Sequence, residues 1–554
     1  MNTIRIKKYL PLIIIAAVLI FLIVCPLVMI FLRAVIRDDR PDFVTAWQTL
    51  TESENAQMIF NSLLLGLLVV IVSTMIAAPL AYLFSRTRFA KYRFFDIIFM
   101  IPFMTPPYIA SMGWILFMQK RGLLQQLIPA AAGSENWFFT LGGLVMVMSL
   151  HVFPFMLTIL KNAMLNIPSS LEEAGAVFGA SFGSRLRKIF MPLISGNYAI
   201  GALLVFVKTI AEYGIPATLG KRIGYYVFTT EIHRNATVAP IDFGKSAVLA
   251  SVLVGVCIMM WFLQNYVTSR RSYNLVSGKG NRFTELKLRT PAKILGWAYI
   301  AVVLLLSVGI PYFSVISTSL IDLRGYGFRP GNFTFQHYID LFTENEKGIR
   351  ALGNSLILAV SAATICAVLG TLIVIAVRKS RSKLGKVVEV VGLLPEMLPG
   401  IVLVIGIMLF WNRIYNVIPL YNTLGIMILA YVVLFLPYTI QYVTSSFTQI
   451  SGSLEAAARV FGGSPGYIFR HVTLPLIMKG VFAGWTMTFI IAFRELVTAS
   501  LIAPPNTLVV STYIVREFEQ GSVSVGMAMA VLCVLFTTTA LLILNRSIDR
   551  QKER

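Results

Sequence analysis

Two stretches of the sequence, 283 residues apart, are nearly identical. The first reads Leu171-Glu172-Glu173-Ala174-Gly175-Ala176-Val177-Phe178-Gly179 and continues to Met191-Pro192-Leu193-Ile194. The second reads Leu454-Glu455-Ala456-Ala457-Ala458-Arg459-Val460-Phe461-Gly462 and continues to Leu474-Pro475-Leu476-Ile477. Between 171–194 and 454–477, 12 of 24 positions are identical and no gap is needed. Such a repeat divides the chain into two copies of one structural unit.

The composition is that of a membrane protein. Of the 554 residues, 57% are hydrophobic and 13% are charged, and the mean hydropathy is +0.78. A soluble domain carries about 25% charged residues. Apolar stretches of about 20 residues, each long enough to cross a bilayer of about 30 Å, recur along the chain. These features exclude a globular enzyme with a single membrane anchor.

The net charge of +22 is better explained by membrane topology than by nucleic-acid binding. Lys and Arg collect in short loops between apolar spans, as the positive-inside rule predicts. The four cysteines lie within apolar spans, and no two have metal-ligand spacing. Neither a disulfide framework nor a CxxC metal site is therefore predicted.

Hydropathy predicts an all-α integral membrane fold with twelve transmembrane helices. The predicted spans are 10–33, 61–84, 96–118, 140–163, 196–216, 246–267, 294–319, 354–377, 387–411, 424–446, 480–502 and 527–545. The first apolar run, which extends to Leu32, is too long for the hydrophobic part of a signal peptide. We expect an uncleaved first span with the basic N-terminus in the cytoplasm.

The distribution of charge supports six spans in each half. Loops 85–95 and 378–386, the linker after the sixth span and the C-terminal tail are all basic. In the twelve-span order they fall on one side of the membrane, and the acidic loop 38–60 falls on the other. Both termini and both repeated stretches are therefore expected in the cytoplasm.

The repeat extends beyond the two opening stretches. Asn61-Ser62-Leu63 matches Asn354-Ser355-Leu356 at an offset of 293 residues, as does Pro102 with Pro395. Ten extra residues in the first copy then change the offset to 283, at which Glu212 matches Glu495. Because each half has an even number of spans, both copies have the same orientation. A parallel repeat with a substrate path between the halves is predicted.

The repeated stretches resemble the coupling loop of type I ABC importer permeases. That loop has a Glu-Ala-Ala sequence, then a Gly, then a basic stretch that ends in a hydrophobic-Leu-Pro pattern. The second copy fits closely, whereas the first departs slightly, with Glu172-Glu173-Ala174 and Met191-Pro192. The resemblance covers essentially the whole chain and implies two fused permease modules in a bacterial cell (inner) membrane. It implies ATPase-coupling roles for Glu172, Glu173, Ala174, Gly179, Pro192, Glu455, Ala456, Ala457, Gly462 and Pro475.

The residue types suit such a role. Residues 171–178 can form a short amphipathic helix, which Gly179 would end because glycine tolerates a positive φ. In the resembled family this helix docks in a groove on the ATPase subunit. A connector helix on the surface would explain one such loop, but two nearly identical loops favour docking.

The chain is expected to be neither an enzyme nor an ATP-binding protein. Gly244-Lys245-Ser246 is similar to the end of a phosphate-binding loop, but position 239, where that loop needs Gly, is Ala. No catalytic motif and no Cys/His metal site are found in the sequence. The resemblance implies that two separate ATPase subunits bind ATP and that an external or periplasmic binding protein delivers the substrate.

These patterns predict five segments along the chain. They are an N-terminal helix with an external loop (1–56), a first permease module (57–267), a cytoplasmic linker with the seventh helix and an external loop (268–349), a second permease module (350–545) and a cytoplasmic tail (546–554).

Three glutamates within or beside predicted spans are candidates for the translocation path. A charge at mid-bilayer costs about 2.5–3.5 kcal/mol on insertion scales. As repeat equivalents, Glu212 and Glu495 should face one another across the pseudo-two-fold axis, at the path or its external gate. The alternative is local pairing, as between Lys208 and Glu212 four residues apart. Glu396 lies between two prolines, which free carbonyl groups where a helix lines a cavity.

The fused layout resembles the ferric-iron importer permeases, as do the stretches 211–217 and 228–232. This resemblance implies ferric iron as the substrate. Permeases for phosphonate, thiamine or polyamine share much of the pattern and stay open as alternatives. A secondary transporter driven by an ion gradient is the alternative from another class. It would have inverted repeats, or discontinuous helices with coupling-ion ligands.

Overall fold

The protein is built almost entirely of helices. The computed structural model describes residues 2–37, 40–92, 94–270, 288–380, 382–450 and 452–552. Within these ranges, ten helices are long and apolar enough to cross a membrane, and two sharply bent helix pairs bring the number to twelve if each pair is one span. The strands there are β1 (Ile36–Arg37) and β2 (Arg40–Pro41), which pair as a short antiparallel ladder. The predicted all-α membrane fold is confirmed.

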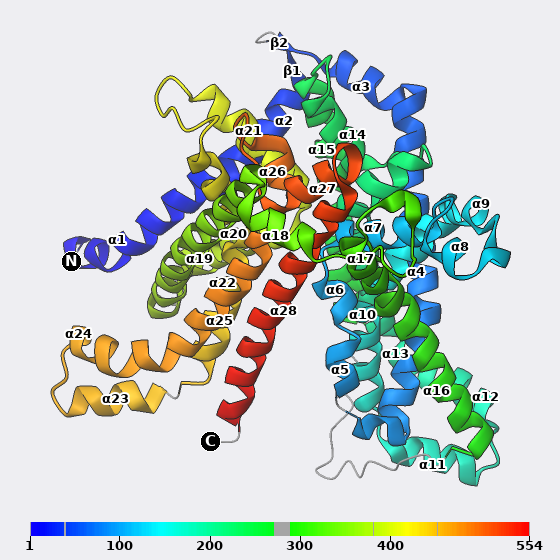
Figure 1. Ribbon diagram of the computed structural model, residues 1–554. Coiled ribbons are helices and arrows are strands. Elements are labelled where there is room, and N and C mark those ends of the chain that lie inside the picture. Colours follow the sequence, from blue (N-terminus) through cyan, green and yellow to red (C-terminus); the bar gives the residue numbers. More distant parts are fainter. Residues whose placement is uncertain are drawn as a thin grey trace. The chain divides into compact units, whose positions relative to one another are not determined.

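The helices gather into two units (Figure 1). The first-module unit comprises Thr51–Glu231 and Gly255–Thr334, and the second-module unit comprises Met1–Leu50, Ile232–Val254 and Phe335–Arg554. The helices of the first-module unit are α4 (Ser53–Arg86), α5 (Phe94–Ile98), α6 (Ile101–Met104), α7 (Pro107–Met118), α8 (Leu123–Leu127), α9 (Ser134–Phe138), α10 (Leu141–Leu165), α11 (Ser169–Val177), α12 (Phe182–Arg185), α13 (Met191–Ala211), α16 (Thr290–Leu304) and α17 (Ile310–Leu320).

The second-module unit is also built of helices. Its helices are α1 (Asn2–Leu19), α2 (Cys25–Val35), α3 (Phe43–Thr51), α18 (Gln336–Thr343), α19 (Glu346–Ser380), α20 (Lys383–Met397), α21 (Gly400–Arg413), α22 (Leu424–Thr448), α23 (Gly452–Val460), α24 (Pro465–Ile468), α25 (Leu474–Phe493), α26 (Val497–Ile502), α27 (Val510–Gln520) and α28 (Val523–Lys552). The residues of α14 (Phe228–Thr237) and α15 (Phe243–Arg270) are divided between the two units.

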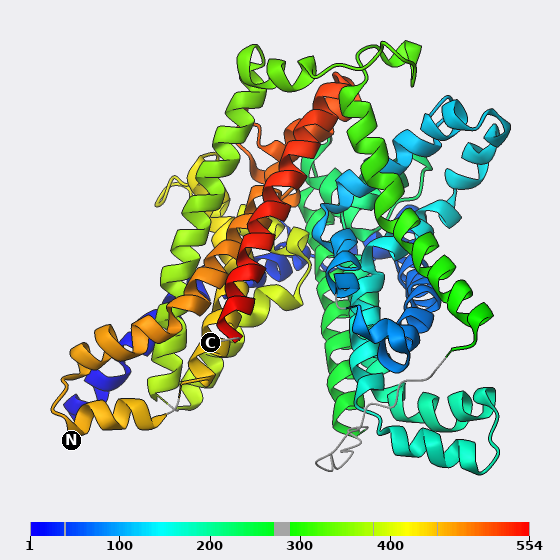
Figure 2. The ribbon, with the colours of Figure 1, turned by 60° about the horizontal axis from the view of Figure 1, so that its bottom comes forward.

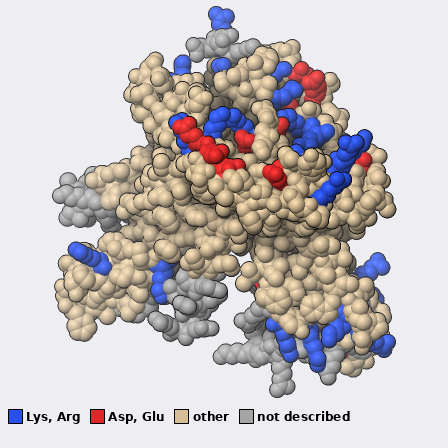
Figure 3. All heavy atoms as spheres, viewed as in Figure 1, with Lys and Arg blue, Asp and Glu red and all other residues tan. Residues whose placement is uncertain are grey.

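The same three-helix core recurs in each unit. In the first-module unit α10 packs against α4 and α13, and in the second-module unit α22 packs against α19 and α25. The opposite side of α4 exposes an apolar stripe with helical spacing, made of Leu63, Leu67, Ile71 and Met75. An exposed apolar stripe on a long helix suits contact with lipid. On the face seen in Figure 3, Lys and Arg lie on the ends that carry the repeated stretches, next to a band almost free of charge.

Each unit contains the first helix of the other half of the sequence. The N-terminal helix α2 packs against α21 in the second-module unit, and α17 packs against α7 in the first-module unit. A Cβ atom at Gly406 would lie 2.7 Å from the carbonyl oxygen of Pro26, and one at Gly113 would lie 2.6 Å from that of Pro311. Gly113 and Gly406 are repeat equivalents at the offset of 293. The two exchanged helices therefore use the same close backbone contact.

The third and ninth predicted spans are broken helices. Phe94–Met104 and Pro107–Leu127 meet at 87°, and Lys383–Met397 and Gly400–Arg413 meet at 111°. Proline lies at each break, since Pro106 and Pro399 are the residues before α7 and α21. Proline has no N–H and clashes with the preceding turn, so a continuous helix is interrupted there.

We expect Gly113→Ala and Gly406→Ala each to destabilise the protein by about 1–3 kcal/mol, because the added methyl group overpacks a backbone contact. Gly353→Ala is the matched control, since Gly353 lies in α19 with no atom within 4 Å of its Cβ position. Thermal unfolding of the detergent-purified protein measures the effect. Equal melting temperatures for all three variants would contradict the close contact.

Candidate coupling helices and translocation path

Each repeated stretch forms a helical hairpin at the end of its unit. The hairpin of α11 and α12 and the hairpin of α23 and α24 both extend beyond the long helices of their own units (Figure 2). The exposed prolines Pro192 and Pro475 are the second residues of α13 and α25, the long helices that follow. Each of these two helices continues directly from a π-helical turn, Leu186–Phe190 or Phe469–Thr473.

The predicted helix end at Gly179 is confirmed, and Gly462 ends the helix of the second copy in the same way. Gly179 has φ +76° and Gly462 has φ +82°. In both copies the next amide, of Ala180 or Gly463, donates 2.9 Å to a carbonyl oxygen five residues back. This is the bond of a Schellman motif, which needs a left-handed residue that glycine adopts without steric cost.

Each hairpin exposes an apolar pair at its tip. Val177 and Phe178 are 83% and 89% exposed, and Val460 and Phe461 are 84% and 90% exposed. The two pairs occupy the same repeat positions. Large side chains at this exposure lose the free energy of apolar burial, about 1.5–3 kcal/mol each. A surface with this cost in both copies is a candidate protein-binding site.

The second hairpin is held in place by its own glutamate. The Thr473 hydroxyl donates a 2.9 Å hydrogen bond to Glu455 Oε1, and Arg459 lies 3.6 Å from Glu455 Oε2. Thr473 is buried at the turn that leads into α25. Glu455 therefore fastens α23 to the base of the next helix, and Ala456 and Ala457 beside it are exposed.

The first hairpin has a different attachment. The repeat equivalent of Thr473 is Phe190, which has no hydroxyl. The Arg86 guanidinium lies 5.1 Å from the centre of the Phe190 ring and donates to the carbonyl oxygens of Met164 and Ile167, at 2.6 and 2.8 Å. A buried guanidinium thus ties α4 to the end of α10 and to the base of α13.

Two of the other predicted residues of the first copy lie on the surface of its hairpin. Glu173 and Ala174 are exposed on α11, and Ala174 accepts a backbone hydrogen bond from Phe178 at the helix end. The side chain of Glu172 lies outside the described part of the structure.

Glu212 and Glu495 lie where a long helix stops and a short one begins. α13 ends at Ala211, and Glu212 Oε1 accepts a 2.7 Å hydrogen bond from the amide of Gly214. α25 ends at Phe493, and the Glu495 carboxylate accepts from the amide of Thr498, at 2.9 Å to Oε2. Both carboxylates therefore cap the backbone at a helix break. The two residues belong to different units, so their predicted approach across the axis stays a prediction.

The matching Asn-Ser sequences secure the same breaks. Ser62 Oγ accepts a 2.8 Å hydrogen bond from Phe228 N at the start of α14, and Ser355 Oγ accepts one of equal length from Val510 N at the start of α27. One residue further on, the hydroxyl groups of Thr229 and Ser511 donate to the backbone carbonyls of Glu212 and Glu495.

The neighbouring asparagines repeat the pattern. Asn61 Nδ2 donates to Tyr226 O at 3.3 Å, and Asn354 Nδ2 donates to Leu508 O at 2.9 Å. Tyr225 adds a bond in the first unit, from its hydroxyl to Asn61 O at 2.9 Å. Burial raises the pKa of the Tyr225 phenol to about 12, so the group keeps its proton and remains a donor at neutral pH.

Glu396 lies one residue before the end of α20, next to the 111° break. Its side chain is exposed, and its Oε2 accepts a hydrogen bond from Gln441 Nε2 on α22. In the part of the chain that the structure describes, no cluster of three or more His, Cys, Asp or Glu side chains could hold a metal ion.

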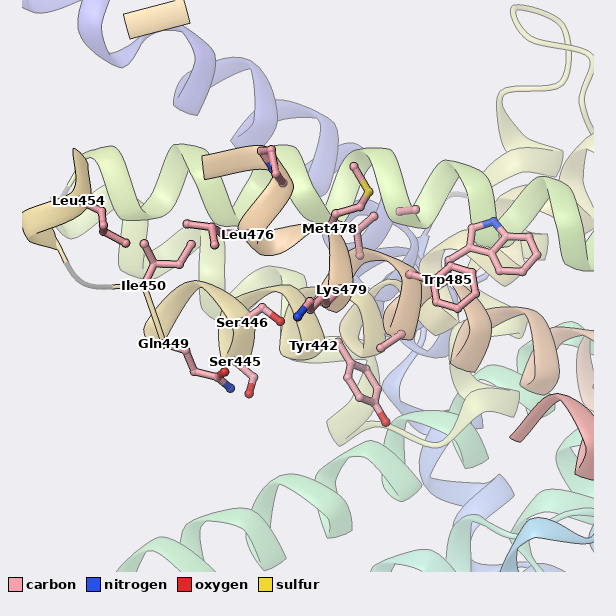
Figure 4. Close-up of a pocket in the computed structure, with 16 residues that line it drawn as sticks. Tyr442, Ser445, Ser446, Gln449, Ile450, Leu454, Leu476, Met478, Lys479 and Trp485 are labelled. Atoms are coloured by element: carbon pink, nitrogen blue, oxygen red, sulfur yellow. The ribbon is translucent and has the colours of Figure 1, made fainter. Parts of the chain in front are cut away.

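An open groove of about 1040 Å³ runs between α22 and α25, close to the hairpin of α23. Figure 4 shows Lys479 pointing into it, near Ser445 and Ser446 of α22. Gln449 and Tyr442 add further polar groups to walls that are otherwise mainly apolar.

Sequence comparison decides the family. The model described as "Binding-protein-dependent transport system inner membrane component" matches residues 70–273 and again residues 351–554. The chain belongs to this family. It is thus a fused, two-module permease of the ABC importer class, and not a secondary transporter. Its helices are discontinuous, so that feature alone does not separate the two classes.

Several relatives of this permease are similar over most of its length. The Fe(3+)-transport system permease protein FbpB 2 of Haemophilus influenzae is 23% identical over 534 residues, covering 95% of this chain and 97% of its own. The ferric transport system permease protein FbpB of Actinobacillus pleuropneumoniae is 26% identical over 486 residues, covering 85% and 68%. A 2-aminoethylphosphonate transport system permease protein, PhnV of Salmonella typhi, is 27% identical over 237 residues, covering 43% and 89%.

We expect Thr473→Val to loosen the second hairpin of the permease, because the lost hydrogen bond to Glu455 is worth about 0.5–1.5 kcal/mol. Hydrogen exchange of the backbone amides in 454–463 should become severalfold faster. Thr473→Ser keeps the hydroxyl and is the matched control, with exchange close to that of the unaltered protein. Unchanged exchange in Thr473→Val would show that Glu455 does not hold the hairpin.

Proposed function

We propose that α11 and α23 each dock one ABC ATPase subunit and transmit its ATP-driven closure to the permease. The apolar pair at the tip of each hairpin carries this proposal, since both copies expose it at equivalent positions. ATP is then bound and hydrolysed on the partner subunits, with one hairpin for each of two ATPases. An external or periplasmic binding protein delivers the substrate to the opposite side.

Glu455 then has a positioning role. A docked helix transmits force only if its base is fixed to the long helices. Glu455 supplies such a fixed point through Thr473, and Arg86 supplies one for the first copy. The proposed orientation places both hairpins and both termini in the cytoplasm, supported by the Lys and Arg on the hairpin ends (Figure 3).

We propose ferric iron as the substrate. The relatives that align over most of this chain are named as ferric transport permeases, whereas the phosphonate permease aligns over less than half of it. A fused two-module chain matches the first group in length. Glu212 and Glu495 are proposed to shape the path by holding its broken helices, with their carboxylates engaged by backbone amides.

Replacing Val460 and Phe461 together by Ser should weaken ATPase docking by about a hundredfold or more, since each apolar side chain contributes about 1.5–3 kcal/mol when buried. The same change at Val177 and Phe178 should have a similar effect. Co-purification of an ATPase subunit and ATP-dependent uptake are the measurements. Val417→Ser is the control, because Val417 is 81% exposed but lies outside both hairpins. Full ATPase recovery with both doubly substituted hairpins would exclude docking at the tips.

Vesicles that contain the permease and its ATPase should take up ferric iron when ATP and an iron-loaded binding protein are supplied. Uptake should stop when ATP is withheld, even with an ion gradient across the membrane. Binding protein loaded with a phosphonate or a polyamine is the comparison. Transport of one of these in place of iron would replace the proposed substrate while leaving the importer mechanism intact.

A further inference from the structure

The second module carries a polar cluster at its broken helix that the coupling mechanism does not use. Glu396 at the end of α20 accepts a hydrogen bond from Gln441 of α22. Tyr438 precedes Gln441 by three residues, which places both on the same face of α22. The half-buried Tyr438 therefore lies on the face of α22 that bonds to Glu396.

The first module is apolar at the same positions. The repeat equivalents of Glu396 and Tyr438 are Phe103 and Phe155, at offsets of 293 and 283. The two rings are in contact, with centroids 4.4 Å apart in an edge-to-face arrangement. This contact shows that the fold brings the two positions together. The second module has replaced an aromatic pair by a carboxylate and a phenol.

The Glu396 carboxylate and the Tyr438 hydroxyl each have an oxygen that can bind a further ligand. Among the described residues, Glu396 Oε1 and the Tyr438 hydroxyl form no hydrogen bond, while Glu396 Oε2 is held by Gln441. The Glu396 side chain is exposed and Tyr438 is half-buried. One carboxylate oxygen is therefore fixed in direction, and its partner oxygen is open to a ligand.

The cluster lies deep in the membrane region. Glu396 follows Lys383, the first residue of α20, by 13 positions, which is about 20 Å of helix. Tyr438 precedes Thr448, the last residue of α22, by 10 positions, or about 15 Å. An exposed carboxylate at this depth is costly against lipid, so it is expected to face water in the transport path.

We propose that Glu396 and Tyr438 form a transient oxygen-donor site for the ferric ion in the second module. The inference rests on the proposed function, because it takes ferric iron as the substrate. Carboxylate oxygen is a ligand suited to hard cations, and a phenolate supplies a second hard oxygen. Binding would release the Tyr438 phenol proton to water and would involve no redox change.

The surroundings favour release as well as binding. The site has two protein oxygen donors and, among the described residues, no cluster of three or more His, Cys, Asp or Glu side chains around them, so its hold on the ion is weak. A transport site must bind well enough to admit its substrate and weakly enough to let it leave. The groove of Figure 4 lies farther along α22 toward the coupling hairpin, with Tyr442, Ser445 and Gln449 as polar groups on its mainly apolar wall.

The test uses the permease–ATPase complex in lipid nanodiscs, titrated with ferric nitrilotriacetate alone. A visible phenolate-to-iron charge-transfer band should appear with the unaltered complex. Tyr438→Phe should abolish the band, and Glu396→Gln should weaken binding by about tenfold or more. Tyr415→Phe is the matched control, since Tyr415 lies after α21, outside the cluster, and should leave the band unchanged.

Uptake with the iron-loaded binding protein separates this inference from the proposed function. Tyr438→Phe and Glu396→Gln should raise KM or lower the rate of iron uptake, while the ATPase activity stimulated by binding protein persists. If the unaltered protein takes up iron and both variants show normal uptake and a normal band, the proposed iron site is wrong. The proposed function as an iron importer would still stand. If the unaltered protein transports no iron, the proposed substrate fails and this site fails with it.

Gln441→Leu distinguishes a ligand site from a structural lock. If the Glu396–Gln441 bond only holds the break in place, this variant should lose thermal stability and uptake as much as Glu396→Gln does. In that case the charge-transfer band would be the same in Gln441→Leu as in the unaltered protein. If Tyr438→Phe also kept the band, the band would not come from Tyr438, and iron binding at this site would be refuted.

Discussion

The structure depends on how backbone polar groups are satisfied where helices break inside the membrane region. A bilayer offers no water to an open N–H or C=O, so each break needs a partner from the protein. In this protein the partners are equivalent residues of the two modules. Ser62 and Ser355 receive the first amides of α14 and α27, and the carboxylates of Glu212 and Glu495 receive amides just past the ends of α13 and α25. These caps allow the chain to fold back at the same place in both modules.

The caps also explain which parts of the fold were predictable. Asn61-Ser62 and Asn354-Ser355 are visible as a repeat because both copies need the same bonds, and Gly179 and Gly462 are visible because both need a positive φ. The helix exchange between the halves was not predicted. It rests on close backbone contacts such as Gly406 with Pro26, between segments about 380 residues apart, and such a contact leaves no periodic pattern in the sequence.

The candidate coupling site was predictable in position but not in its internal bonds. The repeat placed both hairpins, and the structure adds that Val460 and Phe461 are turned outward and that Glu455 is turned inward to Thr473. The first copy has Phe190 where the second has Thr473, so the hydroxyl that donates to Glu455 in the second copy is not repeated in the first. In the sequence, Arg86 looks like one more basic residue of a cytoplasmic loop. The structure shows that it is buried and that it bonds to the end of α10, next to the first hairpin.

The two modules differ at positions on which the caps impose no constraint. A capping serine or glutamate is fixed by the backbone that it serves, so both copies retain it. Between α20 and α22, Glu396 and Tyr438 bond to no backbone group among the described residues, and there the first copy has Phe103 and Phe155. A cluster with ionisable side chains is costlier in a membrane than the aromatic pair that fills the same space in the first copy. Packing therefore does not explain why the second module has polar side chains at these positions. The explanation must come from the substrate that passes along this face.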